Sequence, residues 1–156
     1  MIKIQRFFNF MMRFLANICI FPSLRMCFLR TSGINIGKNT FINMGVQFID
    51  NYLGKGKITI GDRVSIASNT IFIADADPNN SVLRKIESFV KRGNLIIDDD
   101  AWIGAGAIIL PNIHIGKASV IGAGSIVTKD VPDFFIVAGN PARKIGIIKE
   151  EEICEK

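Results

Sequence analysis

Histidine is nearly absent from the sequence: His114 is the only one among 156 residues. A zinc site of the carbonic anhydrase type uses three histidine ligands, and the side chains of this chain cannot supply them. The composition therefore excludes that class of metalloenzyme, and we expect no metal cofactor.

Cysteine is also scarce. The three cysteines, Cys19, Cys27 and Cys154, are odd in number and form no Cys-x-x-Cys pair. A disulfide framework or a structural zinc site would need paired cysteines at suitable spacing. We interpret these residues as reduced thiols, which are typical of a cytoplasmic protein.

Acidic residues are missing from the first third of the chain. Residues 1–49 contain no Asp or Glu but six Lys and Arg, whereas the remainder holds all fourteen acidic residues and is close to neutral. The net charge of +5 is therefore concentrated at the N-terminal end. A nucleic-acid-binding domain would carry a basic stripe with stacking aromatic residues across its surface, so we expect no nucleic-acid partner.

No apolar run is long enough to span a membrane. Met1–Arg30 is rich in Phe, Met, Leu and Ile, but Arg13 interrupts it and Pro22 ends it, short of the roughly 20 residues that a span needs. No small-residue cleavage site of a secretory signal follows. We predict a helical segment over residues 1–30 and leave two interpretations open. It covers one end of the fold or packs on a neighbouring subunit, or it lies on anionic lipid as an interfacial helix.

The sequence is rich in one pattern: an aliphatic residue at every sixth position between Ile97 and Val131. A helix would repeat its apolar stripe every three or four residues, and a long strand every two, so neither element fits. Hexapeptide repetition is typical of a parallel β-helix, in which each unit forms a short strand and a corner. Glycine follows three of these residues, where we expect it to relieve corners with positive φ. The aliphatic series is Ile97, Ile103, Ile109, Ile115, Ile121 and Val127.

The six-residue register begins near Ile34 and is interrupted once. It is lost over residues 74–94, which include the turn-forming sequence Asp-Pro-Asn-Asn. We predict that this segment is a loop extruded from the coil, a position where functional residues often lie. The chain is thus divided into an N-terminal helical segment (1–30), a β-helix domain (31–145) that carries the loop, and a charged C-terminal tail (146–156).

Three blocks of sequence are more specific than the repeat. They are Ile103–Ala107, Ile121–Pro132 and Ala138–Ala142, and the last two contain Thr-Lys-Asp-Val-Pro and Gly-Asn-Pro-Ala. These blocks resemble the hexapeptide-repeat acyltransferases, in the sugar O-acetyltransferase branch that includes galactoside and maltose acetyltransferases. The resemblance covers most of Ile34–Ile145.

The resemblance carries expectations that the spacing alone does not. It implies an all-β fold: a left-handed parallel β-helix of hexapeptide repeats with an N-terminal helix and one extruded loop. Its left-handed connections would differ from the right-handed crossovers that are usual between parallel strands. It also implies a homotrimer with active sites between the subunits, and acetyl-CoA as the acyl donor.

The same resemblance indicates which residues contact the two substrates. Asn43 and Asn51 match acceptor-side positions where polar side chains contact sugar hydroxyls. Lys129 and Arg143 carry the positive charge that adenosine phosphates require, whereas Gly146 stands where a second basic residue is common. For Trp102 a packing role at a subunit contact is the alternative, and for Asn43 a corner position. The residues that match the acetyl-CoA site are Trp102, Ala105, Ala123, Thr128, Lys129 and Arg143.

The sequence departs from the family pattern at the general base. The family has a histidine directly before a proline and seven residues before an arginine, and here Asp77-Pro78 and Arg84 keep that frame without the imidazole. Asp77 is therefore the candidate catalytic residue, although a free carboxylate is a weak acceptor for a hydroxyl proton unless burial strengthens it. His114 lies in a regular repeat unit and is the less favoured alternative.

Together these residues favour an acetyl-CoA-dependent transfer of an acetyl group to a hydroxyl of a sugar or surface-glycan precursor. The acceptor would be a small molecule or a lipid-linked sugar, in the cytoplasm or at the inner face of the membrane. Two alternatives stay open: N-acetylation of an amino sugar, which needs no histidine base, and a non-catalytic trimeric relative. A general base contributes roughly 10²–10⁴-fold, whereas alignment supplies effective molarities up to ~10⁸ M, so loss of the histidine does not exclude catalysis.

Overall fold

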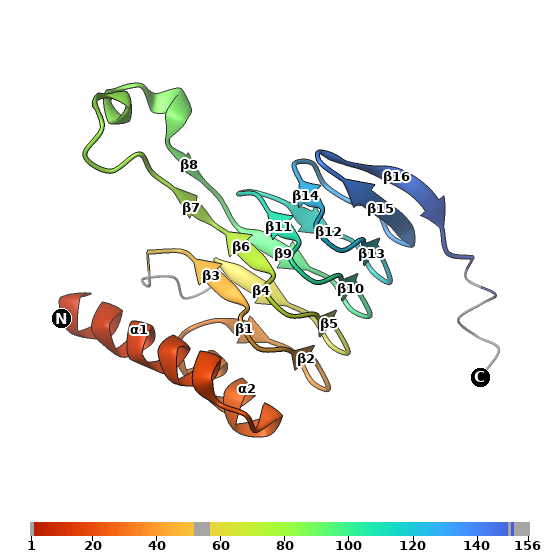
Figure 1. The fold of residues 1–156 in the computed structure, drawn as a ribbon, viewed down its shortest axis with the longest axis horizontal. Helices are drawn as coiled ribbons and strands as arrows, with labels where there is room; N and C mark the ends of the chain where they lie inside the picture. The colour runs from red at the N-terminus through yellow and green to blue at the C-terminus, as the bar shows by residue number, and fades with distance from the viewer. Residues whose placement is uncertain (1, 52–56, 150, 152–156) are drawn as a thin grey trace.

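The computed structural model describes residues 2–51, 57–149 and 151. Two helices precede a series of short strands, and the strands stack into a coil whose axis leads away from the helices (Figure 1). Neither helix, in this described part of the chain, combines the length and apolar character that a bilayer crossing requires. The helices are α1 (Ile2–Ile18) and α2 (Pro22–Thr31).

Over residues 35–73 and 95–127 the strands visit three sheets in rotation, and the fourth strand returns to the first sheet beside the first strand. The loop between these ranges and the last two strands fall outside the rotation. Neighbouring strands within these three sheets are parallel except in the final hairpin, and Ile103 pairs with Ile121, eighteen residues or three hexapeptides further on. These parallel sheets fit a β-helix with one turn of the coil per three repeats, as the spacing predicts.

The bounds of the strands follow the hexapeptide units closely, and most strands contain only two or three residues. The first sheet contains β1 (Asn35–Ile36), β4 (Ile58–Ile60), β9 (Leu95–Ile97) and β12 (His114–Ile115). The second contains β2 (Phe41–Ile42), β5 (Ser65–Ile66), β10 (Trp102–Ile103), β13 (Val120–Ile121), β15 (Phe135–Gly139) and the antiparallel β16 (Ala142–Ile147). The third contains β3 (Gln47–Ile49), β6 (Ile71–Ile73), β11 (Ile108–Ile109) and β14 (Ile126–Val127).

The predicted aliphatic series forms the interior of the coil. All six side chains from Ile97 to Val127 are at most 1% exposed, and each stacks on its equivalent one turn away. In the third sheet the rings of Phe48 and Phe72 stack in the same way, with their centroids 5.3 Å apart. The prediction that every sixth side chain enters one shared core is confirmed.

The reason given for the repeat glycines was wrong. Gly104, Gly116 and Gly122 do not have positive φ. A Cβ on Gly104 would instead lie 2.5 Å from the backbone nitrogen of Ala123 in the next turn, so glycine permits the close approach of successive turns. The corner strain falls two residues later, where Gly106 has φ of +68°.

The ends of the coil are finished differently. At the N-terminal end, α1 and α2 pack together across the first turn, so the predicted helical segment forms two helices with a break before Pro22. At the other end, β16 reaches Ile147 and thus includes the first two residues assigned to the charged tail. Residues 150 and 152–156 of that tail lie outside the described residues, as does Cys154.

The extruded segment leaves the coil after β6 and projects from its side (Figure 1). It begins and ends in a two-stranded antiparallel ribbon, and every residue from 79 to 89 is exposed. The segment contains β7 (Asp75–Ala76), two short 3-10 helices (Val82–Lys85 and Glu87–Phe89) and β8 (Lys91–Arg92).

Candidate functional site

A cluster of charged side chains lies where the loop leaves the coil. Asp75 and Asp77 are two residues apart on β7 and just after it, so their side chains point to the same face. Across the ribbon, Arg92 pairs with Asp75 in register. Its Nε donates to Asp75 Oδ1 at 3.2 Å and its Nη2 donates to Asp77 Oδ2 at 2.8 Å, so one guanidinium joins the two carboxylates.

This cluster continues beneath α1. The Asn51 amide donates from Nδ2 to Asp75 Oδ2 at 2.5 Å, and the preceding residue, Asp50, accepts from Arg13 Nη2 at 2.8 Å. Arg13 and Asp50 are both buried, which is unusual for charged residues unless they are paired. We call this network the charged junction, and its members are Arg13, Asp50, Asn51, Asp75, Asp77 and Arg92.

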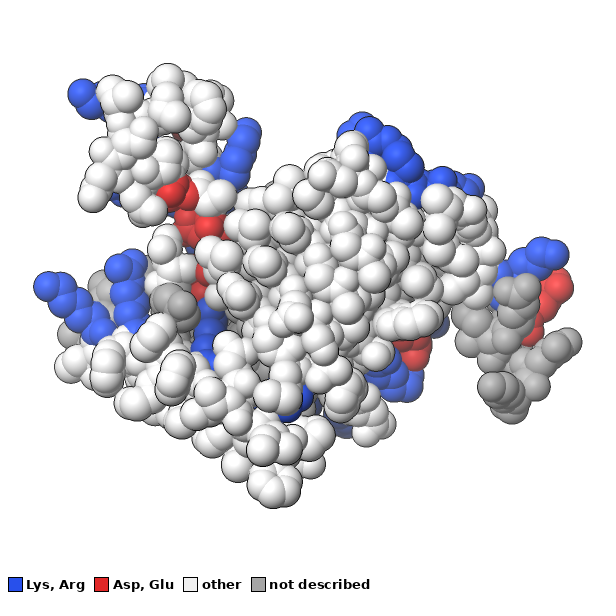
Figure 2. Space-filling view, viewed as in Figure 1, with Lys and Arg blue, Asp and Glu red and all other residues white. Residues whose placement is uncertain are grey.

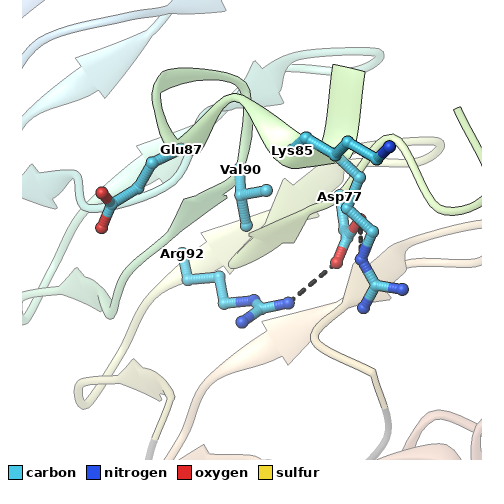
Figure 3. Close-up of a pocket in the computed structure, with 6 residues that line it drawn as sticks. Asp77, Lys85, Glu87, Val90 and Arg92 are labelled. Carbon is cyan, nitrogen blue, oxygen red and sulfur yellow. Dashed lines mark hydrogen bonds and ion pairs between the residues drawn. The ribbon is translucent and has the colours of Figure 1, made fainter. Parts of the chain in front are cut away.

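Asp77, the candidate base, is held firmly in the junction. Its Oδ1 accepts from the backbone N–H of Asn79 at 2.8 Å and lies 3.4 Å from Arg84 Nε. Its Oδ2 accepts from Arg92, and Figure 3 marks this contact with a dashed line. A carboxylate offers about four acceptor positions, so these contacts leave it room for one further hydrogen bond. The side chain is 10% exposed, and that exposed part faces the cavities described next.

Two cavities, each of about 470 Å³, share Asp77 as a wall. The first is the charged pocket of Figure 3, which Arg84, Lys85 and Arg92 also line. The second also includes Asn51, with Phe89 as an apolar wall. Both have the size of a small-ligand site. The structure thus brings Asn51 and Asp77, predicted separately from the sequence, into one cavity.

Asn43 does not line either cavity. It lies at the corner that follows β2, where its Oδ1 accepts from the backbone N–H of Met44 at 2.8 Å. In the single chain its side chain is thus hydrogen-bonded within its own turn. His114 also lies elsewhere, on the first sheet, with its Nε2 2.6 Å from Asp98 Oδ2. It is not close enough to Asp77 to line either cavity.

The residues matched to the acetyl-CoA site lie on other parts of the coil. Ala105 and Ala123 occupy equivalent exposed corners one turn apart, and the N–H of Gly124 donates to the carbonyl of Ala105 at 2.8 Å. Trp102 projects from β10 on the second sheet and is 57% exposed. These three residues form one outer edge of the coil, between the second and third sheets.

The remaining three matched residues meet at the last turn. Thr128, Lys129 and Arg143 line one cavity of about 290 Å³, together with Lys144, whose Nζ lies 4.2 Å from the centre of the Phe135 ring. Basic side chains stand out on this end of the molecule in Figure 2, at the upper right. The single chain therefore places the matched residues in two groups, an outer edge and a basic end, apart from the charged junction.

Sequence reasoning missed several members of this arrangement. Asp75 and Arg92 were not singled out, although the alternation in Asp-Ala-Asp would have indicated two carboxylates on one face of a strand. Lys144 was also missed, and it places a second positive charge beside Arg143 where Gly146 provides none. Arg13 had no local signal, because its partner Asp50 is distant in sequence. Within the described ranges, no group of three His, Cys, Asp or Glu residues is placed to hold a metal ion.

Comparison with known proteins agrees with this architecture. Residues 94–129 match the family model of the bacterial transferase hexapeptide (six repeats). The chain is 40% identical over 124 residues to galactoside O-acetyltransferase of Escherichia coli K12, covering 78% of this chain and 57% of that enzyme. A putative acetyltransferase of Staphylococcus aureus MRSA252 is also 40% identical, over 118 residues. The chain thus spans somewhat over half the length of these relatives.

Solved structures extend the likeness to nearly the whole chain. A hexapeptide-repeat acetyltransferase of Vibrio cholerae, complexed with acetyl coenzyme A, superposes with a TM-score of 0.77 and 28% identity, covering 95% of this chain and 89% of that one. A maltose O-acetyltransferase of Clostridium difficile 630 gives 0.67 and 31%, covering 96% and 89%. The fold and repeats define a hexapeptide-repeat protein. More specifically, the chain belongs to the hexapeptide-repeat acetyltransferases.

Proposed function

We propose that this chain is an acetyl-CoA-dependent acetyltransferase that acts on a hydroxyl of a sugar or surface-glycan precursor. The observation that carries the proposal is the likeness, over 95% of the chain, to an acetyltransferase solved with acetyl coenzyme A. On this proposal the coil is left-handed, the protein is a cytoplasmic homotrimer, and the donor lies along the seam between two subunits. A trimer also explains why one chain separates the outer edge from the charged junction, because a neighbouring subunit would bring the two together.

The donor is proposed to lie against the outer edge and the basic end. The exposed backbone of Ala105 and Ala123 would accompany the pantetheine arm, with Trp102 beside it. Lys129 and Arg143 would bind the phosphates, since both are exposed and line one cavity with Lys144. Charge-assisted hydrogen bonds of this kind are the strong ones in phosphate recognition.

The acceptor is proposed to occupy the cavity shared by Asn51 and Asp77. The acceptor hydroxyl would donate to the remaining acceptor position of Asp77, while its oxygen attacks the thioester carbonyl. Asp77 would take up the hydroxyl proton as the new C–O bond forms, the C–S bond would then break, and the leaving coenzyme A thiolate would receive that proton from Asp77. Arg84 and Arg92 hold the carboxylate in one orientation, and alignment of this kind supplies a large part of the rate in such reactions.

A second candidate is N-acetylation of an amino sugar. One observation that favours it is that both Asp77 oxygens are already engaged by Asn79 and two arginines, whereas a neutral amine attacks a thioester without a base. A mutant N-acyltransferase of Bacillus cereus, solved with dTDP-4-amino-4,6-dideoxyglucose and coenzyme A, is similar with a TM-score of 0.55 and 26% identity, covering 80% of this chain.

The test is an acceptor screen with acetyl-CoA that follows the release of coenzyme A thiol. Acceptors are used in matched pairs that differ only in hydroxyl or amine at one carbon, and hydroxylamine then distinguishes an ester product from an amide. We expect Asp77→Asn to lower transfer to a hydroxyl by roughly 10²–10⁴-fold and transfer to an amine far less.

The control is Asp98→Asn, which changes a half-buried carboxylate after β9 that contacts His114. It should leave both rates unchanged, and a lower rate would favour His114 as the base. If the folded protein releases no coenzyme A thiol with any acceptor in the screen, the result contradicts the proposal and favours a non-catalytic trimer. A rate on hydroxyl acceptors that Asp77→Asn leaves intact would remove Asp77 from the mechanism.

A further inference from the structure

Helix α1 is oriented with its polar face inward. The residues that face the coil are Asn9, Arg13 and Ala16, which are 1–6% exposed and spaced four and three apart, as one face of a helix requires. Arg13 accounts for this orientation, because its guanidinium donates to Asp50 and to the carbonyl of Phe48 at 2.9 Å. A buried charge cannot be turned outward without leaving its partner uncompensated.

The opposite face of α1 is apolar and exposed. Residues two positions apart on a helix point about 200° apart, and Phe7, Met11 and Phe14 each stand two positions before one of the inward residues. The outward stripe repeats at intervals of three and four residues and is 39–73% exposed. Its members are Ile4, Phe7, Met11, Phe14 and Ile18.

This apolar stripe continues into α2. Ile20 and Phe21, in the connection between the helices, are 76% and 71% exposed, and Leu24 on α2 is 47% exposed. In Figure 2 the surface over the two helices, at the lower left, shows no acidic side chains, and its only charged side chains are Lys and Arg. Soluble monomers rarely expose a contiguous apolar surface this extended without a binding role for it.

The charges around the stripe are all of one sign. Residues 1–49 contain no Asp or Glu. Two of their six basic side chains, Arg13 and Arg25, are buried. Arg30 donates to the carbonyls of Ile36 and Gly37, and Lys38 lies on the coil, which leaves Lys3 and Arg6 exposed on α1 itself. A second copy of the same surface would bring like charges together. Phosphate headgroups of an anionic bilayer would neutralise them.

We propose that α1 and the start of α2 form an interfacial anchor that lies in the surface of an anionic membrane. The Phe-rich stripe enters the boundary of the acyl chains, and Lys3 and Arg6 contact the headgroups. At 17 residues α1 is about 25 Å long and lies in the membrane plane. The anchor involves none of the residues assigned to acetyl transfer, so it holds or fails independently of the proposed function.

The test is co-sedimentation of the full chain with vesicles of phosphatidylcholine alone and with vesicles containing 30–40% phosphatidylglycerol. We expect binding to the anionic vesicles that weakens as salt is raised, and little binding to the neutral ones. Loss of each basic side chain, for example Arg6→Ser, should lower the partition coefficient about five-fold. Phe7→Ser with Phe14→Ser should lower it at least ten-fold.

Ile145→Ser is the matched control, because Ile145 is similarly exposed, at 68%, but lies on β16 at the other end of the coil. It should leave vesicle binding unchanged. Circular dichroism and sedimentation velocity are recorded on every variant. The proposal is overturned if the full chain does not bind anionic vesicles at low salt. It is also overturned if the double variant binds them as well as the parent does. A lower oligomeric state of the double variant also overturns it and assigns the stripe to a contact between copies.

Discussion

The coil interior and the charged junction lie side by side but are stabilised in different ways. The interior contains aliphatic side chains that stack turn upon turn, and each is nearly fully buried. The junction joins three segments that are distant in sequence, α1, the end of β3 and the loop ribbon, through carboxylates and guanidinium groups. Figure 2 shows acidic side chains at the neck of the loop, with basic side chains nearby.

This difference separates the apolar interior and the buried Arg13–Asp50 pair, on which stability depends, from the exposed side of the junction, which orients the candidate site. Apolar contacts are non-directional and tolerate small adjustments, whereas ion pairs and hydrogen bonds impose distances and angles. We therefore expect changes in the interior to lower stability without altering the junction, and changes in exposed junction residues to loosen the loop at little cost in stability. The following predictions test that division, in order of effect.

The largest effect is expected for Arg13→Ala. It leaves Asp50 as an uncompensated buried charge, and breaking such a pair costs about 3–5 kcal/mol. Urea denaturation at pH 7 should show this loss in the free energy of unfolding. Arg13→Met with Asp50→Leu, which removes both charges, should recover most of it. If Arg13→Ala alone is as stable as the parent, the junction does not hold α1 in place.

A slightly smaller effect is expected for Ile109→Ala in the interior. The side chain is 0% exposed, and truncation of such a residue costs about 2–5 kcal/mol, with about 3 kcal/mol expected here. Denaturation measures the loss. Ile96→Ala is the control, since Ile96 is 41% exposed and should change stability far less. Faster hydrogen exchange confined to the loop, in place of a global loss, would contradict the division.

A modest effect is expected for Arg92→Ala at the base of the loop. The side chain is half exposed, so its ion pairs contribute at most about 1 kcal/mol to global stability. Its removal frees Asp75 and Asp77 from their shared partner, and amide hydrogen exchange in residues 79–89 should become faster. Arg63→Ala, which breaks an exposed pair on the coil, should leave exchange in the loop unchanged. Exchange that Arg92→Ala does not alter would mean that other contacts order the loop.

The smallest effect is expected for the Asp100→Asn variant, which tests a charge pair outside the junction. The Arg63 guanidinium, hydrogen-bonded to Asp100 at 2.6 and 2.9 Å, lowers the pKa of that carboxyl. Because the folded-state pKa lies below the unfolded value of about 3.9, the pair stabilises the protein above that pH and loses its effect as the pH falls through the folded-state pKa. Thermal denaturation should show a small loss at pH 7 that diminishes as the pH is lowered below about 4. A loss of stability that is the same at neutral and acidic pH would show that packing causes it, and not the charge pair.

Sequence reasoning was most successful where the information is local and repeats. The spacing from Ile97 to Val127 predicted the interior positions, because each hexapeptide forms the same strand and corner whatever its neighbours are. It misjudged Gly104, because the approach of Ala123 in the next turn leaves no mark at the glycine itself. Asp77 and Asn51 were predicted from motif positions, and only the structure shows that they share a cavity.

The sequence by itself determined the coil: a six-residue period, a break over residues 74–94 and an N-terminal segment without acidic residues. Only the tertiary structure decided which face of α1 is buried and which carboxylates Arg92 joins. The physical reason is that burying an apolar side chain depends mainly on its position in a repeating pattern. Pairing a charge depends on a specific partner, and here that partner is 15 to 37 residues away.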